Sequence, residues 1–160
     1  MSTIRSGIGY DVHRLAEDRQ LILGGVKLPH SLGLEGHSDA DVLAHAIADA
    51  LLGAICAGDI GQHFPNTDES IRNISSIEIL KRVAEFLAKK KARAVHVDAT
   101  IIAEAPKIGP HIPAMRRKLA GAIGVRESSV SVKATTNERL GPIGRGEGIA
   151  AIAIATVEME

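Results

Sequence analysis

The chain has 160 residues, with 19 basic and 19 acidic side chains, a hydrophobic content of 45% and an aromatic content of only 2%. The balanced charge and the scarcity of aromatic rings for base stacking argue against a nucleic-acid or membrane-surface partner. The single cysteine excludes intrachain disulfides and cysteine-rich zinc modules. Because no signal-peptide core or membrane-spanning run is present, we expect one soluble, cytoplasmic domain over residues 1–160.

The first half of the sequence predicts a strand, a hairpin and a helix. Alternating apolar side chains predict a strand from Ile4 to His13. Residues 21–28 predict a small hairpin that turns at Gly24-Gly25. Ser38-Asp39-Ala40-Asp41 has the pattern of a serine N-cap followed by an acidic residue, so we expect a helix to open there and to end before Gly58.

The second half predicts two more helices and three more strands. The helices begin near Ser75 and at Pro110, and the strands cover residues 95–104, 130–135 and 149–157. The last strand is apolar on both faces, which favours a central position. We therefore expect an α+β domain: a four-stranded mixed sheet with helices packed on one face, plus a small β-hairpin. The polar loops 57–74 and 136–148 are long, which is typical of functional segments.

Three side chains are candidate metal ligands. Asp11 and His13 lie two apart on a strand, so they share a face with Cα atoms roughly 6.5–7 Å apart. His45 lies in the second turn of the helix expected to pack on that sheet, and Asp49, one turn further on, could orient its ring. Such a set suits a catalytic zinc with one open position. The alternative is a solvated strand edge and an ordinary core histidine.

Two further segments are candidate phosphate and cation sites. His37 and Ser38 lie where the helix is expected to begin, and the free N–H groups and dipole of a helix N-terminus favour a phosphate. Alternatively, Ser38 only caps the helix. Thr135, Thr136 and Glu138 end a strand, and Glu138 could hold Mg²⁺ through phosphate oxygens. The alternative there is a polar strand end before a turn.

Five separate motifs carry a resemblance to a known family. They are Gly9–His13, Gly36–His45, Asp59–Gly61 with Phe64–Asp68, Ile101–Lys107, and Lys133–Glu138 with the glycine-rich stretch to Gly148. In order and spacing the chain resembles the 2-C-methyl-D-erythritol 2,4-cyclodiphosphate synthase family from residue 4 to the last strand. The resemblance implies a lyase of isoprenoid precursor biosynthesis, in the methylerythritol phosphate pathway. Such an enzyme converts 4-diphosphocytidyl-2-C-methyl-D-erythritol 2-phosphate to 2-C-methyl-D-erythritol 2,4-cyclodiphosphate and releases CMP by intramolecular phosphoryl transfer.

The resemblance also implies roles for individual residues. Asp11, His13 and His45 match ligands of Zn²⁺ or another divalent metal, and Glu138 matches a ligand of Mg²⁺ or Mn²⁺ bound with the diphosphate. His37 and Thr136 match the catalytic residues that hold the reacting phosphates. The residues that match substrate-binding positions are Asp11, Val12, His13, His37, Ser38, Asp59, Ile60, Gly61, Phe64, Pro65, Asn66, Thr67, Asp68, Ala103, Glu104, Ala105, Pro106, Lys107, Ile108, Gly109, Thr135, Thr136, Asn137, Glu138, Pro142 and Arg145.

Family members are homotrimers whose active sites lie between subunits, so the resemblance implies the same here. The apolar last strand supports this expectation, because its surplus apolar surface would be buried between subunits. The chain departs from the family at Pro142, where an aromatic residue is usual, and at Glu104, where Gln is common.

Two other functions fit the residues taken without the family. A metal-dependent phosphodiesterase would use the same ligands to activate water and would release CMP with an open-chain product. A non-enzymatic trimeric module that binds a ligand or a metal would leave the two polar loops without a role.

Overall fold

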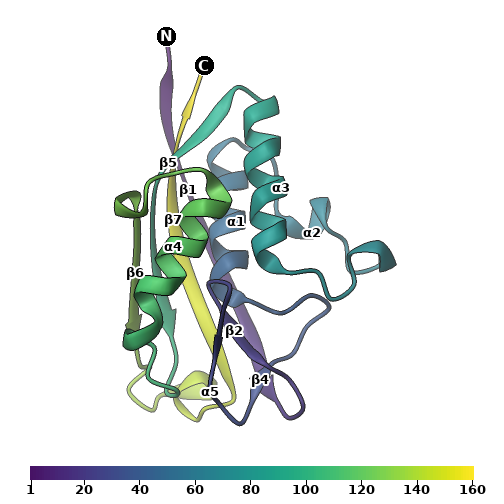
Figure 1. Cartoon of the computed structure of the whole chain (residues 1–160), viewed down its shortest axis with the longest axis vertical. Helices are drawn as coiled ribbons and strands as arrows, with labels where there is room; N and C mark the ends of the chain where they lie inside the picture. The colour runs from purple at the N-terminus through teal and green to yellow at the C-terminus, as the bar shows by residue number, and fades with distance from the viewer.

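The computed structural model describes all 160 residues and contains one five-stranded mixed sheet in the order β4-β1-β7-β5-β6 (Figure 1). Its strands are β1 (Thr3–Ala16), β4 (Gly33–Leu34), β5 (Ala92–Ile102), β6 (Val130–Thr135) and β7 (Gly148–Met159). β5 and β6 are parallel, and the other neighbours are antiparallel. The four predicted strands and the central position of the apolar last strand are confirmed. β4 adds a fifth strand, which at two residues is too short to show alternation.

The long helices lie on one face of this sheet (Figure 1). They are α1 (Val42–Ala54), α3 (Ser76–Lys89) and α4 (Ile112–Ile123). α1 packs on β1 and β7 and is almost entirely buried, because α3 covers its other side. Two short helices, α2 (Ile60–His63) and α5 (Gly141–Gly144), lie in the two long polar loops. The expected α+β class is confirmed, and no helix is both long and apolar enough to cross a membrane.

The hairpin and the start of α1 are joined by one buried carboxylate. β2 (Leu21–Leu23) and β3 (Val26–Leu28) pair across Gly24-Gly25, as predicted, and both glycines have positive φ. The prediction that Ser38 caps the helix is wrong, because α1 begins at Val42 with Asp41 as its N-cap. Asp41 accepts hydrogen bonds from the N–H groups of Gly24 (2.9 Å), Gly25 (2.7 Å) and Ala44 (3.1 Å). Burial, followed by the nearby carboxylate of Asp39, raises the pKa of Asp41 to about 6.

The apolar residues of β1 face away from the helices. Ile8 and Tyr10 pair directly with Ile154 and Ile152 of β7, and these four side chains are 39–65% exposed. The helix-facing side of β1 instead carries Gly7, Gly9, Asp11 and His13 in succession. The sheet therefore has an exposed apolar face and a second face on which β1 presents glycines and then polar side chains to α1.

Candidate functional site

Two glycines bring α1 close enough to β1 for His45 to meet Asp11 and His13. A Cβ atom on Gly9 would lie 1.9 Å from the carbonyl oxygen of Ala46, and one on Gly7 would lie 2.1 Å from that of Ala50. Any larger residue would therefore force the helix away from the strand. The next two residues of this face are the predicted ligands Asp11 and His13.

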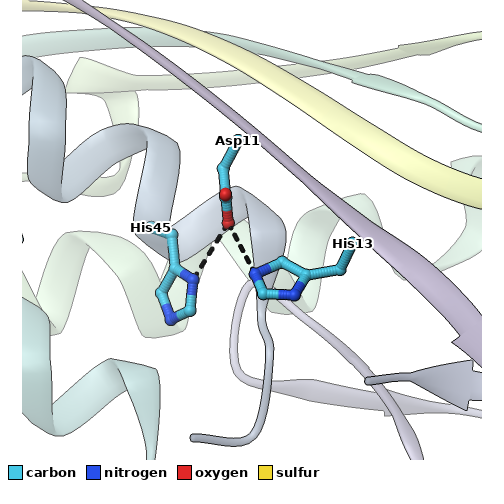
Figure 2. A group of neighbouring side chains, drawn as sticks. All are labelled: Asp11, His13 and His45. Atoms are coloured by element: carbon cyan, nitrogen blue, oxygen red, sulfur yellow. Dashed lines mark hydrogen bonds and ion pairs between the residues drawn. The ribbon is translucent and has the colours of Figure 1, made fainter. Parts of the chain in front are cut away.

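The three predicted metal ligands converge on one point (Figure 2). Oδ2 of Asp11 lies 3.0 Å from Nε2 of His13 and 3.0 Å from Nδ1 of His45. Burial acts to raise the pKa of Asp11, but when the two imidazoles are protonated their hydrogen bonds and positive charge outweigh it and hold that pKa at about 2. Burial acts to lower the pKa of His13, and the Asp11 carboxylate outweighs it so that this pKa is raised. The convergence predicted from a strand and a facing helix is confirmed.

The donor set fits a divalent cation. Nδ1 of His13 lies 2.7 Å from the carbonyl oxygen of Glu35, which only accepts hydrogen bonds, so in the neutral ring Nδ1 carries the proton. Nε2 of His13 is then unprotonated, and its lone pair faces the carboxylate of Asp11. Two lone pairs facing each other at 3.0 Å repel unless a proton or a cation lies between them. Two imidazole nitrogens and one carboxylate are ligands that zinc takes, and the set leaves one position open.

The cluster forms one end of a pocket of about 250 Å³. The other predicted site residues that line it are His37, Ser38, Ile60, Gly61, Phe64 and Asn66. His37 lines the same pocket, and its Nε2 is buried without a hydrogen-bond partner. The pocket is below the usual volume for a drug-sized ligand, roughly 300–1,000 Å³.

Two local expectations around the cluster are wrong. Asp49 does not orient His45; its Oδ1 accepts from the N–H of Ile60 at 2.8 Å and so holds the start of α2. The ring of His45 is oriented by Ser76, whose Oγ lies 2.8 Å from Nε2. Ser38 lies four residues before α1 and is not its N-cap. At the N-terminus of α1, the carboxylate of Asp41 accepts a hydrogen bond from the N–H of Ala44.

A second group of predicted residues lies elsewhere in the chain, at the carboxyl ends of β5 and β6. These strands are parallel, so their ends meet at one edge, and the N–H of Ala103 donates to the carbonyl of Thr135 at 3.0 Å. Oε1 of Glu104 accepts from the N–H groups of Asn137 (2.9 Å) and Arg139 (3.2 Å), which fixes the turn around Glu138. None of these residues lines the metal pocket, because β7 separates β5 from β1 in the sheet.

The residues near the ends of β5 and β6 differ in exposure, and the remaining predicted residues lie elsewhere. Ala103 and Ile108 are buried in the core, whereas Thr135, Thr136, Asn137 and Glu138 are all exposed. Val12 and Pro142 line a separate groove, and Arg145 pairs with Glu147 at 2.8 Å. Pro65, Thr67 and Asp68 are exposed on the loop beside the pocket without lining it.

Sequence reasoning missed the residues that support the cluster. Only a helix start near Ser75 is expected from the sequence, and the next residue, Ser76, lies 31 positions from His45, so no local pattern joins the two. The spacing of Gly7, Gly9, Asp11 and His13 on one face was a usable signal, because glycines on a strand indicate close backbone approach.

Comparisons with known proteins identify the family. The sequence model of the YgbB family matches residues 4–158. A 2-C-methyl-D-erythritol 2,4-cyclodiphosphate synthase from Alkaliphilus metalliredigens is 58% identical over 96% of this chain and 97% of its own length. Among solved structures, the Plasmodium falciparum IspF CDP complex has a TM-score of 0.83 at 34% identity, covering 96% of this chain and 95% of that one.

The bifunctional IspDF from Campylobacter jejuni has a TM-score of 0.95 at 38% identity. That match covers all of this chain and 43% of the bifunctional protein. The sequence match, the shared fold and the metal-competent cluster all point to one assignment. The chain belongs to the YgbB family, the family of the 2-C-methyl-D-erythritol 2,4-cyclodiphosphate synthases.

Proposed function

We propose that this chain converts 4-diphosphocytidyl-2-C-methyl-D-erythritol 2-phosphate to 2-C-methyl-D-erythritol 2,4-cyclodiphosphate and releases CMP. The observation that carries the proposal is the convergence of Asp11, His13 and His45 beside the unpartnered Nε2 of His37. A cation-binding cluster and a histidine that line one pocket suit a ligand with several phosphate oxygens. The sequence relatives and solved structures that it resembles carry the name of this activity, and two of those structures were solved with CDP bound.

The reaction needs no nucleophile from the protein. An oxygen of the 2-phosphate attacks the β-phosphorus of the diphosphate, and the bond from that phosphorus to the oxygen bridging it to the α-phosphate breaks. That oxygen leaves on the α-phosphate as part of CMP, so the product is a cyclic diphosphate. His37 would hold a phosphate oxygen, and the other proposed catalytic residue, Thr136, would hold another. The protein's task is therefore to keep two phosphates in line.

Two cation sites are part of the proposal. Asp11, His13 and His45 would hold Zn²⁺, and Glu138 would hold Mg²⁺ or Mn²⁺ together with the diphosphate. When bound, such ions neutralise phosphate charge as Lewis acids.

The division of the site residues into two groups supports a homotrimer with shared active sites. None of the residues expected to contact the cytosine, 103–109, lines the pocket at the metal cluster, and the turn that carries Thr136 and Glu138 lies elsewhere in the same chain. A neighbouring subunit that brought its 103–109 and 135–138 segments to this pocket would complete the cytidine and diphosphate site. The exposed apolar face of β1 and β7 provides the surface to bury between subunits.

The oligomeric state is testable by light scattering after gel filtration. We expect three chains per particle at micromolar concentration. Ile154→Asp, which places a charge in the exposed apolar patch, should lower the mass and the activity together. A monomeric mass for the wild-type protein would contradict both the trimer and the shared site.

The reaction itself is tested by incubating the protein with the proposed substrate and following the products by phosphorus NMR. We expect the resonances of a cyclic diphosphate to appear together with those of CMP. An open-chain phosphate with CMP would instead establish a phosphodiesterase. No turnover in the presence of Zn²⁺ and Mg²⁺ would favour a binding module.

A further inference from the structure

A buried serine, remote in sequence from the metal cluster, contacts the far side of His45. Ser76 is the first residue of α3 and is completely buried. Its Oγ lies 2.8 Å from Nε2 of His45, the ring nitrogen that points away from Asp11. Its hydroxyl also donates to Oδ1 of Asp39, and its backbone N–H donates to Oδ2 of the same carboxylate at 3.0 Å.

These contacts fix the direction of each hydrogen bond. A carboxylate only accepts hydrogen bonds, so the single proton of the Ser76 hydroxyl is committed to Asp39. The oxygen of Ser76 then offers His45 only lone pairs, and Nε2 of His45 must be the donor. In a neutral imidazole, a proton on Nε2 leaves Nδ1 bare. Nδ1 is the atom that lies 3.0 Å from Asp11 at the cluster.

Ser38 does not impose the same constraint. Its Oγ is also near Nε2 of His45, at the longer distance of 3.2 Å, and it accepts from the N–H of Ala40 at 3.1 Å. No carboxylate takes its proton, so Ser38 is able to donate to His45 or accept from it. Ser76 is the partner that fixes the tautomer.

We propose that Asp39 and Ser76 form a positioning relay that holds His45 with its Nδ1 lone pair facing the metal. The relay rests on the proposed metal site, and neither residue touches the substrate or the cation. It complements the carbonyl of Glu35, which holds the proton of His13 on Nδ1 and so leaves bare its Nε2, the nitrogen that faces Asp11. Both imidazoles are thereby preset as ligands before a cation arrives. Groups of this kind outside the ligand shell commonly change metal affinity by about 10–100-fold.

The test compares Ser76→Ala with Ser75→Ala. Ser75 is the adjacent residue, is exposed and makes no side-chain hydrogen bond at the helix start, so its loss controls for the substitution itself. We expect the Zn²⁺ dissociation constant, measured by competition with a chelator, to rise about 10–100-fold in Ser76→Ala and to stay unchanged in Ser75→Ala. Activity lost by Ser76→Ala at limiting Zn²⁺ should return at saturating Zn²⁺.

The outcomes separate the relay from the metal site. Wild-type affinity in a folded Ser76→Ala variant would overturn the relay and leave the metal site intact. A wild-type protein that binds no Zn²⁺ would overturn both.

A second measurement needs no variant and covers the case in which Ser76→Ala does not fold. Nitrogen NMR of the metal-free wild-type protein labelled with ¹⁵N-histidine, at about pH 9 and thus well above the ordinary imidazole pKa, reports the tautomer of each ring. We expect the proton of His45 on Nε2. A proton on Nδ1 would show that the relay does not set the ring and would overturn the proposal.

Discussion

Replacing His45 with alanine should remove the metal and nearly all turnover while the protein stays folded. His45 supplies one of the three ligand atoms that converge at the pocket, and neither Asp11 nor His13 replaces it from the strand. Loss of a direct ligand should exceed the roughly 10–100-fold effect of losing a residue that only hydrogen-bonds to a ligand, so we expect activity to fall by at least about 100-fold. The fold should persist, because alanine is a better helix former than histidine and the large apolar core does not include His45.

Elemental analysis of the purified variant, together with its melting temperature, measures both parts of this prediction. His30→Ala is the matched control, because His30 lies outside the cluster and outside the pocket. The control should keep one Zn²⁺ per chain and full activity. Full zinc occupancy in a folded His45→Ala protein would rule out the proposed ligand set.

The long helices and strands and the three metal ligands could be predicted from the sequence, because both depend on regular spacing of residues. Asp11 and His13 share a face of β1 through the two-residue period of a strand, and His45 lies on the helix that packs against them. The same alternation did not reveal which face of β1 is inward. Its apolar side is exposed, and its inner side carries Gly7 and Gly9 because α1 lies too close for larger residues.

The features that sequence reasoning missed are set by tertiary contacts. Asp41, rather than Ser38, caps α1 because the turn at Gly24-Gly25 packs there and supplies two further N–H groups to its carboxylate. Helical spacing placed Asp49 near His45, but the N–H of Ile60 from the following loop binds it instead. In both cases residues distant in sequence compete for a polar side chain, and local periodicity carries no information about them.

The identity of the nucleophile separates a cyclase from a hydrolase, and a truncated substrate tests it. In the proposed reaction the 2-phosphate of the substrate attacks the diphosphate within the same molecule. Intramolecular attack in a fixed geometry reaches effective molarities of roughly 10⁵–10⁸ M, far above the concentration of water. We therefore expect 4-diphosphocytidyl-2-C-methyl-D-erythritol, which lacks the 2-phosphate, to release CMP several orders of magnitude more slowly than the full substrate.

The comparison is made at saturating concentrations of both compounds with Zn²⁺ and Mg²⁺ present, and CMP release is measured. Saturation matters because the truncated compound keeps the cytidine and the diphosphate and should still bind, so a slower release then reports chemistry rather than affinity. A reaction without enzyme under the same conditions gives the background of uncatalysed hydrolysis to subtract from each rate. If the two compounds released CMP at comparable rates, water would be the nucleophile, because the missing phosphate could not have contributed. The cluster of Asp11, His13 and His45 would then serve to activate water, and the chain would be a metal-dependent phosphodiesterase with the fold of a cyclodiphosphate synthase.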